Sequence, residues 1–164
     1  MIVFEQRLEQ LVELLPKVVG FTIKYGYGTQ DELNKYLALP RNESPYPLIW
    51  LTVAKDRENL NEPKVTRNSN IWIATVSMMQ SEMNPFIYDT DYKSILIPIA
   101  DNLIKALQQS GSSMITNNEI EKEFLPNFSI RENNGQVDVW NALVLNAEIT
   151  FNNATSCINT IKFN

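Results

Sequence analysis

Apolar side chains recur with the period of an α-helix in two long stretches of the chain. The stronger stretch runs from Asp91 to Gly111. Its apolar residues recur at every fourth position and share one helical face: Ile95, Ile99, Leu103 and Leu107. Gly111 is suited to end the helix, because glycine readily adopts the left-handed conformation that follows a last helical turn. We therefore predict a central helix here, laid across one face of a sheet.

Pro98 lies inside this helical pattern. Its nitrogen has no hydrogen to donate to the carbonyl of Ser94, and its ring clashes with that carbonyl. Two interpretations follow. Either the helix begins late, with Pro98 in its opening turn, or it begins near Tyr92 and is kinked at the proline. We favour the second.

The other helical stretch opens the chain, from Ile2 to Leu15. Apolar residues lie on one face, and glutamate and glutamine cover the opposite face. Pro16 ends the helix, since the residue before a proline is driven out of the helical region. The acidic outer face is either solvated or a contact between subunits. A shorter helix is predicted over 31–38, after a segment at 18–27 that is a short strand or an extended arm.

Two segments in the first half of the chain have the pattern of strands. Leu48–Ala54 is almost continuously apolar, which is typical of a strand buried on both faces. Ile71–Met78 is rich in β-branched and aromatic residues. The polar segment Lys55–Asn70 between them is expected to be a long loop. The two strands are therefore predicted to form an antiparallel pair with a protruding tip.

The segments that follow the central helix are mostly strand-like. A long strand is predicted over Val137–Asn152, where apolar residues occupy both faces. The remaining expectations are, in chain order, a strand or extended turn at 114–116, a brief helical turn at 119–125, a strand at 127–132, a tight turn at 133–135 and an edge strand at 157–163.

This order of elements predicts an α+β fold in a single domain over residues 1–164. We expect a mostly antiparallel sheet of about four to five strands, with the N-terminal and central helices packed on one face. At 164 residues the chain is long enough to bury its own core. The expected structural core consists of three tryptophans and three helix residues: Trp50, Trp72, Trp140, Ile99, Leu103 and Leu107.

Composition narrows the classes of function. The formal net charge is −5 and the pI is near 4.8, which argues against a surface that grips nucleic acid. There is no histidine and one cysteine, Cys157, so the usual triads, zinc sites and disulfides have no residues to form them. Neither a signal peptide nor an apolar run long enough to span a membrane is present, so synthesis in a reducing cytoplasm is expected.

The remaining candidates for chemistry have simpler structural interpretations. Asp89 and Asp91 form the tightest acidic pair, which we interpret as helix capping rather than part of a cation site. Asp56 and Glu58 lie in the polar segment and are expected to be solvated. The sequence therefore predicts no enzyme, no catalytic residues, no metal and no cofactor.

Two local segments carry a resemblance to a known family. The chain enters the first predicted hairpin strand through Tyr46-Pro47-Leu48-Ile49-Trp50. Its central helix contains Ile97-Pro98-Ile99-Ala100-x-x-Leu103. With the order of elements from Leu48 to Phe151, the chain resembles the tail-terminator and tail-completion proteins of long-tailed phages, which join head to tail as rings at the neck. The region from Val18 to Pro47 departs from that pattern.

The resemblance implies a structural protein of the virion neck or tail, made in the host cytoplasm. Its partners would be copies of itself in a ring and other neck, tail or portal proteins. DNA would pass through without being specifically bound, and no membrane is involved. The long polar loop would contact neighbours through Asp56, Arg57, Glu58, Asn59, Glu62, Lys64 and Arg67. The alternative is a small monomeric or dimeric ligand-binding domain whose tryptophans line a pocket.

Overall fold

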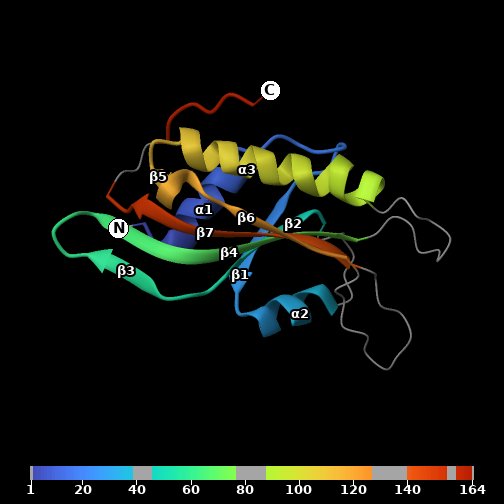
Figure 1. The fold of residues 1–164 in the computed structure, drawn as a ribbon, viewed down its shortest axis with the longest axis horizontal. Helices are drawn as coiled ribbons and strands as arrows, with labels where there is room; N and C mark the ends of the chain where they lie inside the picture. The colour runs from blue at the N-terminus through green and yellow to red at the C-terminus, as the bar shows by residue number, and fades with distance from the viewer. Residues whose placement is uncertain (1, 39–45, 77–87, 127–139, 155–157, 164) are drawn as a thin grey trace.

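The computed structural model describes residues 2–38, 46–76, 88–126, 140–154 and 158–163. These segments form a seven-stranded sheet with helices on both faces (Figure 1). The elements in chain order are α1 (Phe4–Glu13), β1 (Lys24–Gly28), α2 (Gln30–Ala38), β2 (Leu48–Thr52), β3 (Asp56–Asn59), β4 (Lys64–Val76), η1 (Tyr88–Leu96, a π-helix), α3 (Ile97–Gln109), β5 (Ser113–Ile115), η2 (Thr116–Asn118, a 3₁₀ turn), β6 (Glu121–Leu125) and β7 (Trp140–Asn152).

Two long antiparallel strands form the centre of the sheet. β4 and β7 are 13 residues each and pair along their whole length, from Lys64 opposite Asn152 to Val76 opposite Trp140. Two short strands, β2 and β3, pair with the outer edge of β4, while β5 and β6 pair with that of β7. β1 joins β2 in parallel. The sheet is therefore larger than the expected four to five strands, and it is mixed.

The expected long loop at 55–70 is wrong in its extent. Residues 56–59 form β3, residues 64–70 belong to β4, and only the turn at 60–63 connects them. Side chains alternate across β4, so that Val65, Arg67 and Ser69 are buried on the same face as Ile71 and Ile73. The alternation continues through the polar half of the strand. Because polar Arg67 and Ser69 occupy the buried positions there, the hydrophobic pattern of the sequence does not identify this half of the strand.

The larger part of the core lies between the sheet and the pair α1 and α3. Figure 1 shows both helices on the same side of the sheet, as the sequence predicted. Ile99, Leu103 and Leu107 of α3 are completely buried there. They meet a layer of strand residues in register, because Ile49, Ile73 and Leu143 are cross-strand neighbours, as are Leu51, Ile71 and Leu145.

The opposite face of the sheet carries the tryptophans. Trp50 and Trp140 are buried on this side, and Trp72 is half-buried between them. α2 covers part of this face through Leu33, Tyr36 and Leu37. A side chain at Gly26 is excluded here, because an added Cβ would lie 2.7 Å from the Trp50 ring. Both faces of the sheet are thus covered at its β1–β2 end.

The central helix changes its winding at Pro98. It begins at Tyr88 rather than near Tyr92, runs as the π-helix η1 to Leu96, and continues as α3 with Pro98 in the first turn. In η1 the Ser94 hydroxyl donates to the carbonyl of Asp89, five residues back (2.7 Å). Proline fits the first turn of an α-helix, where its missing N–H lacks a helical partner in any case. Neither interpretation is correct in full: the helix begins earlier than either expected, and Pro98 lies in the first turn of its α-helical part, where the winding changes.

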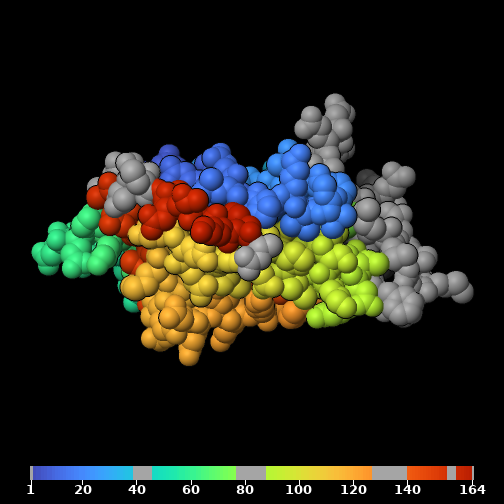
Figure 2. Space-filling model, turned by 90° about the horizontal axis from the view of Figure 1, so that it is seen from above, coloured from blue at the N-terminus to red at the C-terminus, as the bar shows by residue number. Residues whose placement is uncertain are grey.

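The structure also differs from the expectations for the segments after the central helix. The expected helical turn at 119–125 is wrong, because residues 121–125 form β6 along β7. The segment 158–163 is not an edge strand. It lies along α3, where the Asn159 amide donates to the carbonyl of Ser110 (2.9 Å), and Figure 2 shows the C-terminal segment between α3 and the N-terminal part of the chain. The strand at 127–132 and the turn at 133–135 fall outside the described residues.

Leu103 provides a test of how much the central helix contributes to the core. Its side chain is completely buried, so Leu103→Ala is expected to lower the free energy of unfolding by about 2–5 kcal/mol. Gln108→Ala, at an exposed position of the same helix, should change it by less than about 0.5 kcal/mol. Urea unfolding of both variants measures the difference. A loss below about 1 kcal/mol for Leu103→Ala would contradict the central place of α3 in the core.

Candidate interaction surface at the β3–β4 hairpin

The β3–β4 hairpin projects from one end of the molecule. Figures 1 and 2 show it extending beyond the body of the protein. Its turn is ordered by local hydrogen bonds: the Asn59 side-chain oxygen accepts from the amide of Asn61 (2.9 Å), and the amide of Lys64 donates to the carbonyl of Glu62 (2.7 Å). Leu60, at the turn, is 94% exposed. The hairpin therefore presents a defined tip to its surroundings.

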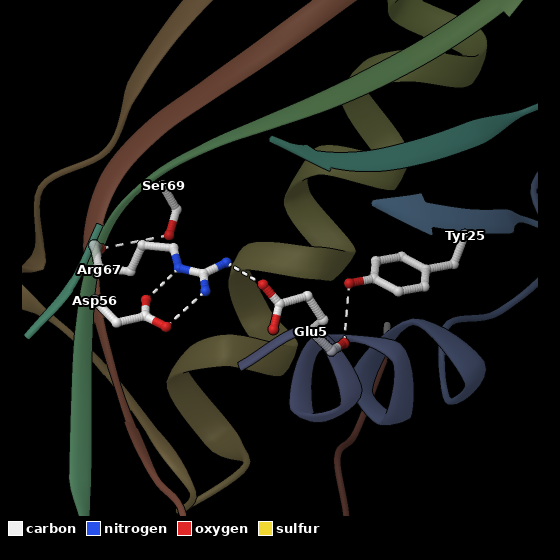
Figure 3. Close-up of polar contacts among 5 residues, drawn as sticks. All are labelled: Glu5, Tyr25, Asp56, Arg67 and Ser69. Atoms are coloured by element: carbon white, nitrogen blue, oxygen red, sulfur yellow. Dashed lines mark hydrogen bonds and ion pairs between the residues drawn. The ribbon is translucent and has the colours of Figure 1, made fainter. Parts of the chain in front are cut away.

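A buried arginine anchors the base of this hairpin (Figure 3). Arg67 is only 3% exposed. Its Nε and Nη2 donate to the two carboxylate oxygens of Asp56 on β3 (2.5 and 2.8 Å), and its Nη1 donates to Glu5 on α1 (2.6 Å). Bidentate pairs of this kind fix orientation as well as distance. The three residues, called here the Arg67 cluster, join α1 to both strands of the hairpin.

Aromatic rings complete the surroundings of the guanidinium group. It lies 4.4 Å from the centre of the Phe4 ring, which meets Phe151 edge to face at 4.6 Å. Burial by itself lowers the pKa of Arg67, but the hydrogen bonds that it donates to Asp56 and Glu5 outweigh burial, and the net effect is a raised pKa. The arginine is therefore a permanent cation held by two carboxylates.

Further bonds hold α1 against the sheet near this cluster. The Tyr25 hydroxyl donates to the carbonyl of Glu5 (2.9 Å), which links α1 to β1. Burial, followed by the nearby charge of Glu5, raises the pKa of Tyr25, so its phenol remains protonated. Arg7, also buried, donates to the carbonyl of Asn152 at the end of β7 (3.2 Å). Helix α1 thus braces the hairpin base from the core side.

A second set of polar contacts lies on the opposite face of the hairpin. Arg57 of β3 forms an ion pair with Glu148 of β7, and Thr116 donates to the same carboxylate (2.8 Å). The hydrogen bond from Thr116, then that from Arg57, lowers the pKa of Glu148. Thr66 and Thr150 are hydrogen-bonded across the central ladder (2.7 Å). These contacts are more exposed than the Arg67 cluster. They connect the hairpin to β7 and to η2 on the face that lies opposite that cluster.

The seven residues proposed from the sequence as a subunit contact do not lie on one surface. Arg67 is inside the protein. Asp56 is exposed, and its carboxylate is bonded to Arg67. Arg57 is bonded to Glu148 on the other face of the hairpin. The remaining four residues are exposed and lie nearer the tip: Glu58, Asn59, Glu62 and Lys64. These four and Leu60 are exposed at or near the tip, whereas the exposed side chains of Asp56 and Arg57 lie at the base of the hairpin and are engaged in ion pairs.

The expected core residues have clearer positions. Ile99, Leu103, Leu107, Trp50 and Trp140 are buried, and Trp72 is half-buried. The ring centres of Tyr36 and Trp50 are 5.4 Å apart. Those of Tyr46 and Trp140 are 3.8 Å apart. The indoles of Trp50 and Trp140 therefore pack against tyrosines.

Sequence reasoning missed the role of Glu5 and the burial of Arg67. The signal for Arg67 is its position, since it continues the alternation of Val65, Ile71 and Ile73 along β4. No comparable signal identifies Glu5, because its partner is 62 residues away in the chain. Asp91 was expected to cap a helix. It is completely buried instead, and its carboxylate accepts a hydrogen bond from the side chain of Asn141 (2.6 Å).

Neither metal sites nor membrane spans emerge from the described segments. Within them, no group of three or more aspartate, glutamate, cysteine or histidine side chains is placed to hold a metal ion. No helix in these segments is both long and apolar enough to cross a membrane.

No protein-family model matches the chain, and no curated protein sequence is significantly similar to it.

Arg67→Met tests whether the cluster fastens the hairpin. Removing the cation leaves two carboxylates facing each other. We expect a loss of about 2–4 kcal/mol in unfolding free energy, near the lower end of the range for buried pairs because Asp56 retains contact with water. Arg57→Met removes an exposed pair from the same hairpin and should cost less than about 1 kcal/mol. Equal losses of unfolding free energy for the two variants would show that the buried Arg67 stabilises the hairpin no more than the exposed Arg57 does.

The lowered pKa of Glu148 predicts a pH dependence. The folded protein favours the carboxylate, so this contribution to stability is complete above the ordinary value of 4.5 and disappears as pH falls through the lower folded pKa. Thr116→Val removes the largest cause and should move the pKa back toward 4.5. Carbon-13 NMR titration of the Glu148 carboxyl measures both values. A wild-type pKa at or above the ordinary value would contradict the assigned hydrogen bonds.

Proposed function

We propose that this protein is a structural component of a tailed-phage particle and assembles with copies of itself into a ring at the neck or tail. In that position it joins the tail to the portal of the capsid and leaves a passage for DNA. The central part of the chain, from β2 through α3 to β7, is the scaffold of each subunit. The projecting hairpin makes contacts between subunits.

The observation that carries this proposal is the projecting β3–β4 hairpin. A ring requires each subunit to present one surface to the next subunit and a different surface to the previous one. An arm that extends beyond the body, with its base fastened by the Arg67 cluster and its tip exposed, is suited to such a contact. Preorganisation of the arm reduces the entropy that would be lost on assembly.

Two further features support the proposal. The resemblance to tail-terminator and tail-completion proteins covers the chain from Leu48 to Phe151, which contains β2, β4, α3 and most of β7. The net charge of −5 is suited to a passage for DNA, since an acidic surface repels phosphate groups and lets a duplex move without being held.

The alternative, a ligand-binding domain lined by tryptophans, receives less support. Trp50 and Trp140 are 5% and 2% exposed, and each has a tyrosine ring against its indole. An indole in that position contributes to packing between helix, loop and sheet. We therefore retain the structural assignment.

The oligomeric state tests the proposed function. We expect the purified full-length chain to form a closed oligomer of defined mass at micromolar concentration, measured by light scattering and native mass spectrometry, with ring-shaped particles in negative stain. Deleting Asn59–Pro63 should abolish the oligomer and leave the circular dichroism spectrum of a folded protein. Unchanged assembly of the deletion variant would remove the tip from the interface. A strict monomer at every concentration, absent from phage particles, would overturn the proposal.

A further inference from the structure

The tip of the hairpin has a distinctive chemical pattern. Leu60 is the most exposed large apolar side chain of the described residues, and Glu58 and Glu62 lie two positions to either side of it. Both glutamates are exposed, and Glu62 forms an exposed ion pair with Lys64 of the same hairpin (2.6 Å). The bond between Asn59 and the amide of Asn61 orders the backbone around Leu60. The tip is therefore an ordered apolar point with acidic flanks.

A second apolar point lies in the connection between α1 and β1. Val18 and Phe21 exchange two backbone hydrogen bonds (3.2 and 2.9 Å) and close a two-residue turn at Val19 and Gly20. Both central residues have positive φ, of 50° and 78°. Val19 is an unusual choice there, because a β-branched side chain is strained in the left-handed region where asparagine or glycine is normal. Val19 and Phe21 are 64% and 41% exposed.

The flanks of this second point are basic. Between Glu13 and Asp31 the chain contains two lysines, Lys17 and Lys24, and no acidic residue, although the whole chain is acidic. Both lysines are exposed, and neither forms an ion pair with any residue in the described segments. The lysines of this turn thus complement Glu58 and Glu62 of the hairpin tip in charge, and both centres are apolar.

The two points lie at opposite ends of the molecule. Figure 1 shows the hairpin tip at one end of the longest axis and the turn that precedes β1 toward the other, and Figure 2 agrees. They therefore cannot meet within one subunit. We propose that the hairpin tip of one copy, centred on Leu60, docks on the Val19–Phe21 turn of a second copy, with Glu58 and Glu62 facing Lys17 and Lys24.

Such a contact is heterologous, because it joins two different surfaces of identical chains. Repetition of a heterologous contact produces a ring when the rotation closes and a filament when it does not. The contact involves few side chains and is smaller than a stable two-body interface, so it requires closure of the ring to be durable. This inference rests on the proposed function and specifies the surface by which that assembly forms.

Disulfide trapping tests the contact directly. In a Cys157→Ser background, Leu60→Cys and Val19→Cys are combined in one chain and oxidised mildly. Because a disulfide requires Cα atoms about 4.4–6.8 Å apart, a bond between these two positions forms only if tip and turn meet. We expect dimers and a ladder of larger species on a non-reducing gel. Leu60→Cys with Gln108→Cys, an exposed residue of α3, is the matched control and should give none.

A charge exchange supplies an independent measurement. Glu58→Lys with Glu62→Lys should raise the concentration at which half of the chains are assembled by about tenfold or more, because each tip then repels its acceptor. Adding Lys17→Glu and Lys24→Glu to the same chain should restore most of the loss. Sedimentation velocity measures the midpoint, and circular dichroism verifies that each variant is folded.

The outcomes separate this inference from the proposed function. A ladder specific to positions 19 and 60, together with rescue by charge exchange, supports the docking contact. An oligomeric wild-type protein with neither result leaves the ring proposal standing and overturns the contact. Leu60→Cys alone trapping dimers would mean that two tips meet, and would also overturn it. A wild-type protein that stays monomeric, with no trapped species, would overturn both proposals.

Discussion

The rest of the structure depends on the ladder between β4 and β7. Thirteen residues of each strand pair without interruption, and every other strand except β1 pairs directly with one of the two. The alternation along these strands decides which side chains meet the helices and which meet the tryptophan side. A shift of register by one residue would exchange Ile71 and Ile73 with Trp72 and Ala74, and would disrupt the packing of both faces. The ladder is therefore specified by packing on both of its faces.

The same ladder connects the core with the proposed interaction surface. At one end of β4, Ile71 and Ile73 lie under α3, and at the other end Arg67 lies under α1. Because Arg67 is buried, its bonds to Asp56 and Glu5 are shielded from water and fix the hairpin in direction as well as in place. The assembly surface proposed above is thus an extension of the central strands rather than a separate loop. Its orientation is set by the core.

Prediction from sequence succeeded where periodicity was continuous. Ile95, Ile99, Leu103 and Leu107 identified the central helix, and the apolar run from Leu48 identified β2. Prediction failed where polar residues occupy strand positions, as in β3 and the first half of β4, and in β6, whose Glu121, Lys122 and Glu123 are exposed. In the candidate surface, the tip residues were named correctly as exposed. Arg67 was assigned to the same surface although it is buried, and Asp56 was assigned there although its carboxylate is bonded to Arg67.

The sequence by itself determined the main helices, the strongest strands and an acidic chain without histidine, because these properties depend on neighbouring residues or on composition. Only the tertiary structure decided the parallel pairing of β1, the change of winding at Pro98 and the meeting of Glu5 with Arg67. The strand pairing and the ion pair join residues that are distant in the chain. The environment of Pro98 is set by the elements that pack around its helix. The hairpin is the clearest case. Its residues have the composition of a solvated loop, and the ion pair between Glu5 and Arg67 that directs it forms only once α1 has packed against β4.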